Sequence, residues 1–516
     1  MYFIFIFSSE IMTLSEFEGL GEPINFWRYF WKISQIPRCS KREDLIRDYI
    51  IEEAKKFGFE YKVDKIQNVV IKIVANPFLD DSKRVVLQCH MDMVCEKNEN
   101  VDHDFSKDPL KLKIIDINGK KWITAEGTTL GADNGVGIAY LLTIMKLIHE
   151  GKLKLDSLNL DLLFTVNEEL GLKGAKEIER HMIGGKYMIN LDSEEDDKFT
   201  IGCAGGLTME IEGDIDFKEI KNFGPNLIPI QISIKGLQGG HSGTDINKGR
   251  ANAIKELTKI LWNLDKKHEI WINTLKGGNL PNAIPREASA ILFTKKSDFN
   301  NIKETVQSIA KSIKELYNGV EPDLMVEFKE LENYEIQECF SPEFQKKLLG
   351  FLHLVPNGPI YNHPTLENLV HTSSNLASIK INNNKIEIII SQRSLNEPEK
   401  QQIFEKVKAL LEFTGLKLAI TIRGEYPSWP PDFRSTLVSI AKSTYKELFN
   451  EEVIIQAIHA GLECAILREH FPNMEMISIG PNVIDGHSPD ERLEVQSVGK
   501  VWKLLIRLLK NLEKAN

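Results

Sequence analysis

Apolar and polar positions alternate along the first 205 residues in a way that predicts strands and helices in turn. The segment Leu158–Val166 is apolar over nearly its whole length, which is typical of a central strand covered on both faces. Strand and helix patterns alternating in this way predict an α/β fold, a mixed sheet flanked by helices. We expect helices at 24–57 (two, with Ser40 capping the second), to about 149 and at 173–182, and strands at 60–64, 68–74, 84–89, 110–115, 122–124, 158–166 and 186–191.

The pattern changes after residue 205, and this change predicts the domain organisation. Residues 206–424 carry two successive rounds of alternating strands and amphipathic helices, which we interpret as an inserted α+β lid domain. Residues 425–516 return to the first pattern, with a strand at 474–479 and a closing helix at 493–513. We therefore expect a catalytic domain formed by 1–205 and 425–516, interrupted by a lid at 206–424. A chain of 516 residues is also too long for one core.

Polar residues follow several of the predicted strands directly. In open α/β sheets, binding sites gather beyond the carboxyl ends of the strands. Candidate site residues lie at such ends, or in the glycine-rich run 127–137 before the helix that is expected to end near 149. They are His90, Asp92, Asp133, Glu168, Glu169, Asp192 and His487. Histidine and carboxylate ligands suit zinc, cobalt or manganese. Two such ions about 3.5–4 Å apart would need one bridging carboxylate.

Each of these residues also has an ordinary structural interpretation. A His-x-Asp triplet occurs by chance, and a Glu-Glu pair at a strand end is usually solvated. Asp133, before Asn134-Gly135, could be a turn residue or a helix cap, and His487 could be an ordinary loop residue. Their joint occurrence at successive strand ends favours a metal site over these alternatives.

Composition narrows the class of protein. A net charge of −10 without a Lys/Arg stripe argues against a nucleic-acid partner, and no apolar run reaches membrane length. The six cysteines form no CxxC pair, which predicts thiols and a reducing, cytoplasmic compartment. The apolar segment Met1–Phe7 lacks a basic flank, so we favour Met12 as the true start over a signal peptide.

Seven stretches together carry a resemblance to a known family. The sequence resembles the co-catalytic zinc metallopeptidases that include aminoacylases, glutamate carboxypeptidases and carnosine-type dipeptidases. It is most similar to members acting on Xaa-His dipeptides. The resemblance spans about residues 25 to 513. The stretches are His90–Lys97, Asp102–Pro109, Gly127–Gly137, Asn167–Gly171, Leu191–Glu195, Gly239–Gly243 and Gly480–Pro489.

The resemblance implies a role for each candidate in the predicted metal centre. It implies two zinc ions per subunit, with cobalt or manganese as alternatives. The implied metal ligands are His90, Asp133 (bridging), Glu169, Asp192 and His487. Glu168 would be the general base, and Asp92 would hold the His90 ring in one tautomer.

Substrate handling is implied for the lid and its surroundings. His241 would stabilise the oxyanion, while Asn282, Arg393 and Gly461 would bind the substrate. The implied protein is a cytoplasmic dipeptidase, monomer or homodimer, whose partner is a dipeptide rather than a nucleic acid or membrane. A tripeptidase, an N-acyl amino acid deacylase, a carboxypeptidase or a non-catalytic metal-dependent peptide-binding protein remains an alternative.

Overall fold

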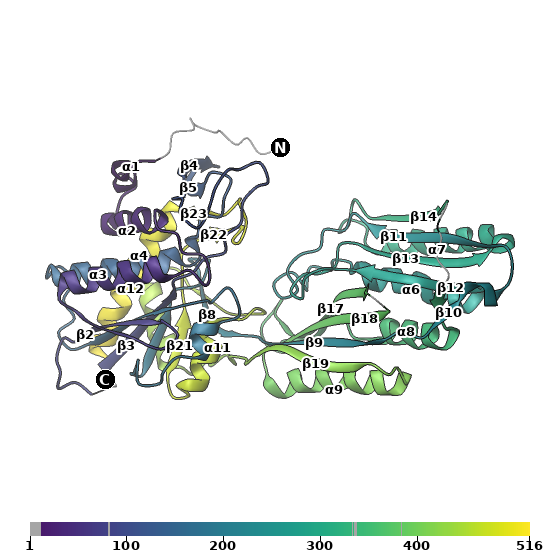
Figure 1. Cartoon of the computed structure of the whole chain (residues 1–516). Coiled ribbons are helices and arrows are strands. Elements are labelled where there is room, and N and C mark those ends of the chain that lie inside the picture. The colour runs from purple at the N-terminus through teal and green to yellow at the C-terminus, as the bar shows by residue number, and fades with distance from the viewer. Residues whose placement is uncertain (1–11, 81–82, 333, 335–337, 383, 516) are drawn as a thin grey trace. The chain divides into compact units, whose positions relative to one another are not determined.

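The computed structural model describes residues 12–515, apart from 81–82, 333, 335–337 and 383. The chain forms two compact units (Figure 1). Unit 1 comprises residues 1–202, 429–457 and 462–516, and unit 2 comprises residues 203–428 and 458–461. The short segment 458–461 joins unit 2 from within the last part of the chain, which the hydrophobic pattern did not predict. The question of Met1 against Met12 concerns a segment outside the described residues.

Unit 1 is built on an eight-stranded mixed sheet, which agrees with the predicted fold class. Its central strands β6, β3, β7 and β21 are neighbours in that order and run parallel. Strand β21 comes from the last part of the chain and lies between β7 and β8. In spatial order the strands are β1 (Glu60–Val63), β2 (Val69–Ile73), β6 (Asn159–Thr165), β3 (Arg84–His90), β7 (Tyr187–Asn190), β21 (Glu475–Ser478), β8 (Lys198–Cys203) and β20 (Ile454–Ile458).

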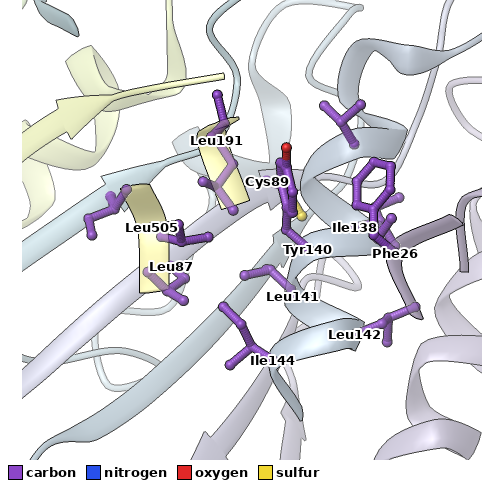
Figure 2. Packing of buried hydrophobic residues seen from close by; sticks show 14 of the residues in the cluster. Phe26, Leu87, Cys89, Ile138, Tyr140, Leu141, Leu142, Ile144, Leu191 and Leu505 are labelled. Atoms are coloured by element: carbon purple, nitrogen blue, oxygen red, sulfur yellow. The ribbon is translucent and has the colours of Figure 1, made fainter. Parts of the chain in front are cut away.

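Alternate residues of the central strands enter the main core. Leu87 and Cys89 of β3 pack with Tyr140, Leu141 and other buried residues of α4 (Figure 2). Burying an aliphatic or aromatic side chain of this size contributes about 1.5–3 kcal/mol. The intervening residues of the same strands face the other side of the sheet, toward α11. The helices of unit 1 are α1 (Leu14–Glu18), α2 (Ile24–Ser34), α3 (Asp44–Phe57), α4 (Ala132–His149), α5 (Lys173–Lys176), α10 (Thr436–Phe449), α11 (Glu463–His470) and α12 (Val495–Lys514).

Two local expectations were wrong. The helix expected at 173–182 is only the single turn Lys173–Lys176, because the Gly174 N–H donates to Val166 O and pins this segment against the end of β6. Ser40 does not cap the helix that follows it. That helix begins at Asp44, and the Ser40 hydroxyl instead donates to a carboxylate oxygen of Asp92 at 2.7 Å.

A small four-stranded sheet completes unit 1, in the order β22-β23-β5-β4. Its pairing of β23 with β5 joins the chain segment after residue 491 to the segment before residue 126. Its strands are β4 (Leu112–Ile117), β5 (Lys120–Ala125), β22 (Val483–Ile484) and β23 (Arg492–Glu494).

Unit 2 contains a nine-stranded antiparallel sheet with its own hydrophobic core. The order is β14-β11-β13-β12-β17-β18-β9-β19, and β16 pairs with β17. The sheet strands are β9 (Gly205–Asp214), β11 (Leu227–Lys235), β12 (Ile270–Gly277), β13 (Ala288–Lys295), β14 (Met325–Glu330), β16 (Gly358–Asn362), β17 (Val370–Asn382), β18 (Lys385–Ser394) and β19 (Ala419–Tyr426). The helices are α6 (Ala253–Lys267), α7 (Phe299–Leu316), α8 (Pro342–Leu354) and α9 (Glu397–Thr414), and β10 (Phe217–Glu219) pairs with β15 (Glu338–Phe340).

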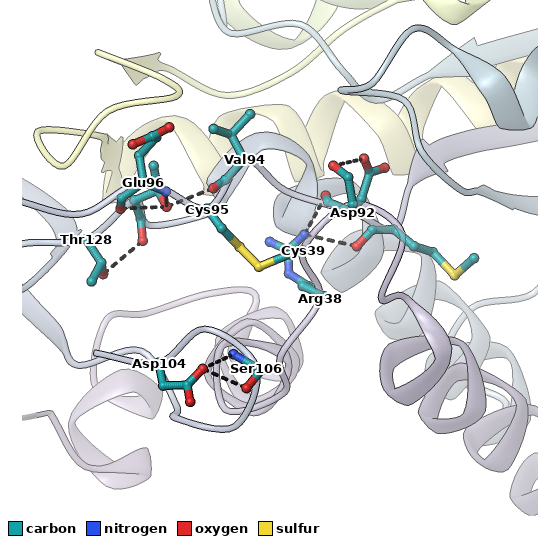
Figure 3. Close-up of a disulfide and its surroundings, with 12 residues drawn as sticks. Arg38, Cys39, Asp92, Val94, Cys95, Glu96, Asp104, Ser106 and Thr128 are labelled. Atoms are coloured by element: carbon teal, nitrogen blue, oxygen red, sulfur yellow. Dashed lines mark hydrogen bonds between the residues drawn. A yellow bond between two sulfur atoms is a disulfide. The ribbon is translucent and has the colours of Figure 1, made fainter. Parts of the chain in front are cut away.

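The cysteines correct the expectation of thiols throughout. Cys39 and Cys95 form a disulfide, with their Cα atoms 5.7 Å apart (Figure 3). The two residues are 56 positions apart in the sequence. They meet because the Met93 N–H donates to Arg38 O and joins the two segments. Cys89, Cys203, Cys339 and Cys464 are buried and lie outside any disulfide.

None of the helices in the described part of the chain is long and apolar enough to cross a membrane.

Candidate metal centre

The parallel strands of unit 1 bring the predicted ligands to one edge of the sheet. His90 is the last residue of β3, Glu168 and Glu169 follow β6, and Asp192 follows β7. His487 lies in the loop beyond β21. Because β6, β3, β7 and β21 are parallel neighbours, their carboxyl ends lie side by side. Asp133 reaches the same place from the first turn of α4.

Asp133 lies between the two histidines. One of its carboxylate oxygens is 2.8 Å from His90 Nε2, and the other is 3.0 Å from His487 Nε2. His487 Nε2 is also 3.0 Å from Glu169 Oε1, and His90 Nε2 is 3.3 Å from Asp192 Oδ1. The side chains thus form two sets that share Asp133. This is the division expected of two metal ions with one bridging carboxylate.

The donor set fits a pair of divalent cations. Three carboxylates, those of Asp133, Glu169 and Asp192, converge with side chains that are 18%, 6% and 7% exposed. Concentrating negative charge out of water is unfavourable without nearby positive charge. His90, Asp133 and Glu169 also present ligand atoms within 4.8 Å of one another.

Hydrogen bonds of the Asp133 carboxylate keep it ionised. Burial alone would raise the pKa of Asp133, but the hydrogen bonds from His487 and His90 outweigh burial and hold the pKa below its ordinary value. An ionised carboxylate with one oxygen toward each imidazole can bind an ion on each side.

Asp92 holds the imidazole ring of His90 in one orientation. His90 Nδ1 lies 3.1 Å from the Asp92 carbonyl oxygen and 3.4 Å from its carboxylate, so Nδ1 carries the proton and Nε2 is left to bind metal. The Asp92 carboxylate also accepts from Ser40 and from the backbone N–H groups of Glu168 and Glu169. One carboxylate therefore fixes two of the ligand-bearing segments.

Glu168 lies beside Glu169, three residues after the end of β6. Among the described residues its carboxylate forms neither a hydrogen bond nor an ion pair with the imidazole of His90 or His487, unlike Asp133 and Glu169. Burial raises the pKa of Glu168 well above its ordinary value, and the charges of Glu169 and Asp192 add to that effect against His90. A carboxylate with an elevated pKa can accept and return a proton near neutral pH.

Arg38 joins three segments of the site, a role that the sequence pattern did not predict. Its buried guanidinium donates to the carbonyl oxygen of Asp92 at 2.8 Å (Figure 3). It also donates to the carbonyl oxygens of Met91, at 3.1 Å, and of Gly131. Gly131 has a positive φ of 67°, and a Cβ there would lie 2.5 Å from Arg38 Nη2. A glycine is therefore required at this point of close approach.

Glu491 also joins two segments of the site. Its carboxylate accepts hydrogen bonds of 2.7–2.8 Å from the backbone N–H groups of Leu130, Gly131 and Ala132. N–H groups at the start of a helix such as α4 have no acceptor within the helix itself. Glu491 is 2% exposed and lies four residues after His487. It therefore connects the loop of one ligand to the turn that carries Asp133.

The carboxylate of Glu463 is also buried, against side chains of β3 and β6. Glu463, at the start of α11, accepts from Gln88 at 2.6 Å and from the Thr165 hydroxyl at 2.6 Å. Its other oxygen is buried without a partner in the described structure. Burial raises the pKa of Glu463 from 4.5 to about 7, against the opposing effect of His90.

Glu463 should make the metal-free protein less stable as the pH rises. Its folded pKa is above the unfolded one, so the folded state holds the proton more tightly between pH 4.5 and about 7, and its stabilising contribution is lost across that window. Glu463→Gln should remove about 3 kcal/mol of this pH dependence. Urea unfolding in chelator at pH 5 and pH 8 measures it, with exposed Glu469→Gln as control. Equal pH dependence in Glu463→Gln and wild type would contradict the assignment.

The predicted substrate residues gather in unit 2. Arg393 Nη2 lies 3.4 Å from His241 Nε2, and Ser242 N–H donates to Asn282 O at 2.7 Å. Gly461 packs against Tyr426, whose hydroxyl accepts from Arg393 Nη1 at 2.6 Å. The structure thus brings together His241, Asn282, Arg393 and Gly461, while their roles stay predictions.

His241 is held in one tautomer by its own loop. Its Nδ1 accepts from the backbone N–H groups of Gly243 at 3.3 Å and Thr244 at 3.2 Å. In the neutral ring the proton therefore resides on Nε2. This makes Nε2 an N–H donor, as a group stabilising an oxyanion must be.

The functional side chains that sequence reasoning missed share one property. Arg38, Glu491 and Tyr426 act on backbone groups or on residues distant in the sequence, so no local spacing marks them. Glu463 is different, because it lies only two residues after the candidate Gly461, at the first position of the short helix α11.

Comparison with known proteins identifies the family of the chain. Residues 86–511 match the sequence model of Peptidase family M20/M25/M40. The cytosol non-specific dipeptidase of Escherichia coli (strain K12) is 34% identical over 507 residues, covering 97% of this chain and 99% of that protein.

Solved structures of peptidases are also similar to this chain. The crystal structure of aminoacylhistidine dipeptidase from Vibrio alginolyticus superposes with a TM-score of 0.81 at 34% identity, covering 95% of this chain and 96% of that one. A tripeptidase from Staphylococcus aureus shares the fold, with a TM-score of 0.56 at 15% identity over 95% of this chain and 98% of its own. The family match over most of the chain and the near full-length relatives show that this protein belongs to peptidase family M20/M25/M40.

Proposed function

We propose that this protein is a two-metal dipeptidase that hydrolyses the peptide bond of dipeptides, Xaa-His dipeptides among them. The observation that carries the proposal is the convergence of His90, His487, Glu169 and Asp192 on the shared carboxylate of Asp133. The relatives from E. coli and V. alginolyticus, which match nearly the whole chain, are named as dipeptidases.

The proposed metal ligands divide into two sets. His90 and Asp192 would hold one ion, His487 and Glu169 the other, and Asp133 both. We propose zinc, although cobalt and manganese accept the same ligands. Divalent ions bound there would lower the pKa of a water molecule and polarise the scissile carbonyl.

Glu168 carries the proton through the proposed reaction. It takes a proton from the attacking water as the new C–O bond forms, and it returns that proton to the leaving amine nitrogen as the C–N bond breaks. The raised pKa of Glu168 suits both transfers. His241 is proposed to donate its Nε2 proton to the developing oxyanion.

Arg393 is proposed to bind the carboxylate at the C-terminus of the dipeptide. Its side chain is only 7% exposed, and its Nε is buried without a hydrogen-bond partner among the described residues. A buried guanidinium N–H that lacks an acceptor is unfavourable unless a ligand supplies one. A planar carboxylate matches the guanidinium fork in shape and charge.

We also extend the compartment named for the E. coli relative to this protein, and propose that it works in the cytosol.

A substrate panel on metal-stripped protein tests the proposal. Zinc, cobalt or manganese is added back, and hydrolysis is measured for carnosine, other Xaa-His dipeptides, a tripeptide and an N-acyl amino acid. We expect turnover of dipeptides only in the presence of a divalent ion. Faster turnover of the tripeptide or the acyl amino acid would reassign the substrate class. Binding of dipeptides without cleavage under every ion would favour a non-catalytic peptide-binding protein.

A further inference from the structure

In unit 2, a tyrosine and an arginine from two strands meet across a glycine on the strand between them. Strand β9 lies between β18 and β19, and Gly206 of β9 is directly opposite both Arg393 of β18 and Tyr426 of β19. Adjacent strands are about 4.8 Å apart, so Tyr426 must cross the width of β9 to reach Arg393. It does so, and Arg393 Nη1 donates to its hydroxyl at 2.6 Å.

The crossing is possible only because glycines leave room for the ring. A Cβ on Gly206 would lie 2.4 Å from Tyr426 Cζ and 2.5 Å from its hydroxyl oxygen. A Cβ on Gly461 would lie 2.9 Å from Tyr426 Cε2. All three distances are shorter than van der Waals contact, so any larger residue at either position would displace the ring. Two glycines from distant parts of the chain thus form a fitted seat for Tyr426.

The hydroxyl of Tyr426 fixes the direction of the Arg393 guanidinium. The hydrogen bond from Nη1 to Tyr426 restrains rotation of the planar group about its last bonds, because such a rotation would break this bond. Its buried Nε is the donor left without a protein acceptor in the described residues. A tyrosine hydroxyl that accepts from arginine also keeps its own O–H to donate. A bound carboxylate would supply acceptors for both donors.

We propose that Tyr426 is a positioning residue that sets the requirement for a free C-terminal carboxylate on the substrate. This rests on the proposed role of Arg393 in the dipeptidase function. Tyr426 holds the guanidinium in the orientation that a carboxylate needs, and it adds one hydroxyl donor beside it. The Tyr426 ring also explains why residue 461 is a glycine, since a larger residue there would collide with the ring.

Tyr426→Phe tests the proposal because it keeps the ring in its seat and removes only the hydroxyl. The KM for a free-acid dipeptide should rise about tenfold with kcat unchanged, since the lost contact is equal in the ground and transition states. Hydrolysis of the same dipeptide as its C-terminal amide should not change. The matched control is Tyr317→Phe, which removes a hydroxyl bonded to Glu256 at 2.9 Å elsewhere in unit 2.

A binding measurement separates this proposal from the proposed function. In a Glu168→Gln background, calorimetry with the same dipeptide should show affinity about tenfold weaker with Tyr426→Phe than with Tyr317→Phe. If wild type cleaves no dipeptide but this difference in affinity appears, the dipeptidase function fails while the role of Tyr426 stands. If Tyr426→Phe leaves KM and affinity unchanged, or weakens acid and amide equally, the positioning role is wrong.

A second variant, at Gly206, displaces the same hydroxyl by removing the space that the Tyr426 ring occupies. Gly206→Ala places a methyl group where the Tyr426 ring lies and should raise the KM for the free-acid dipeptide at least as much as Tyr426→Phe. The double variant Gly206→Ala/Tyr426→Phe should have a KM close to that of the single variants. Both changes remove the same contact, that between the Tyr426 hydroxyl and Arg393. A fully additive combination would contradict the proposal.

Discussion

Glu168→Gln is expected to lower kcat by about 100- to 10 000-fold while the protein keeps its metal. Glutamine has the size of glutamate but cannot take a proton from water. The ligand set converges through Asp133, Glu169 and Asp192, and Glu168 is outside the contacts that join them. Steady-state kinetics on a dipeptide and metal analysis of the same sample measure both parts of the prediction.

The matched control is Glu177→Gln, an exposed glutamate nine residues further along the same segment. It should leave both kcat and metal content unchanged. A Glu168→Gln enzyme with wild-type kcat would remove Glu168 as the base. A variant that lost one ion together with its activity would show instead that Glu168 is a ligand.

Asp133→Asn should remove activity and reduce the bound metal from about two ions per chain to one or fewer. The amide of asparagine is neutral, and only one of its two atoms can accept a metal. The two contacts of Asp133, 2.8 Å to His90 and 3.0 Å to His487, would then lose their shared anionic partner. Metal content after dialysis, followed by zinc titration, measures the loss.

Asp490→Asn provides the comparison, since this exposed aspartate lies three residues after His487 in the same loop. It should bind two ions and turn over dipeptide like wild type. Retention of two tightly bound ions by Asp133→Asn would mean that Asp133 does not bridge them.

The place where His90, Glu169 and Asp192 meet could be predicted because each of them lies just beyond an apolar strand or at its last residue. A run such as 158–166 predicts a buried strand, and a polar residue just beyond it must lie at the sheet edge. The parallel order of β6, β3, β7 and β21 then brings His90, Glu169, Asp192 and His487 together. Hydrophobic patterning thus determined both the fold class and the side of the sheet on which the site lies.

The groups that hold those ligands in place could not be predicted in this way. Arg38 donates to carbonyl oxygens more than fifty positions away, and Glu491 accepts from N–H groups about 360 positions away. Backbone groups are the same at every residue, so the sequence does not mark the partner. The Ser40 hydroxyl and the Cys39 sulfur have side-chain partners instead, but these lie 52 and 56 positions away, too far for local spacing to mark them.

The position of β21 has a consequence for the order in which the protein is made. Strand β21 (Glu475–Ser478) fills the space between β7 and β8, although both of those strands are complete by Cys203. More than 270 residues separate β8 from β21, so this sheet cannot acquire its full set of strands until that stretch has been synthesised. His487 lies nine residues beyond β21, so the proposed metal centre also depends on this late-joining part of the sheet.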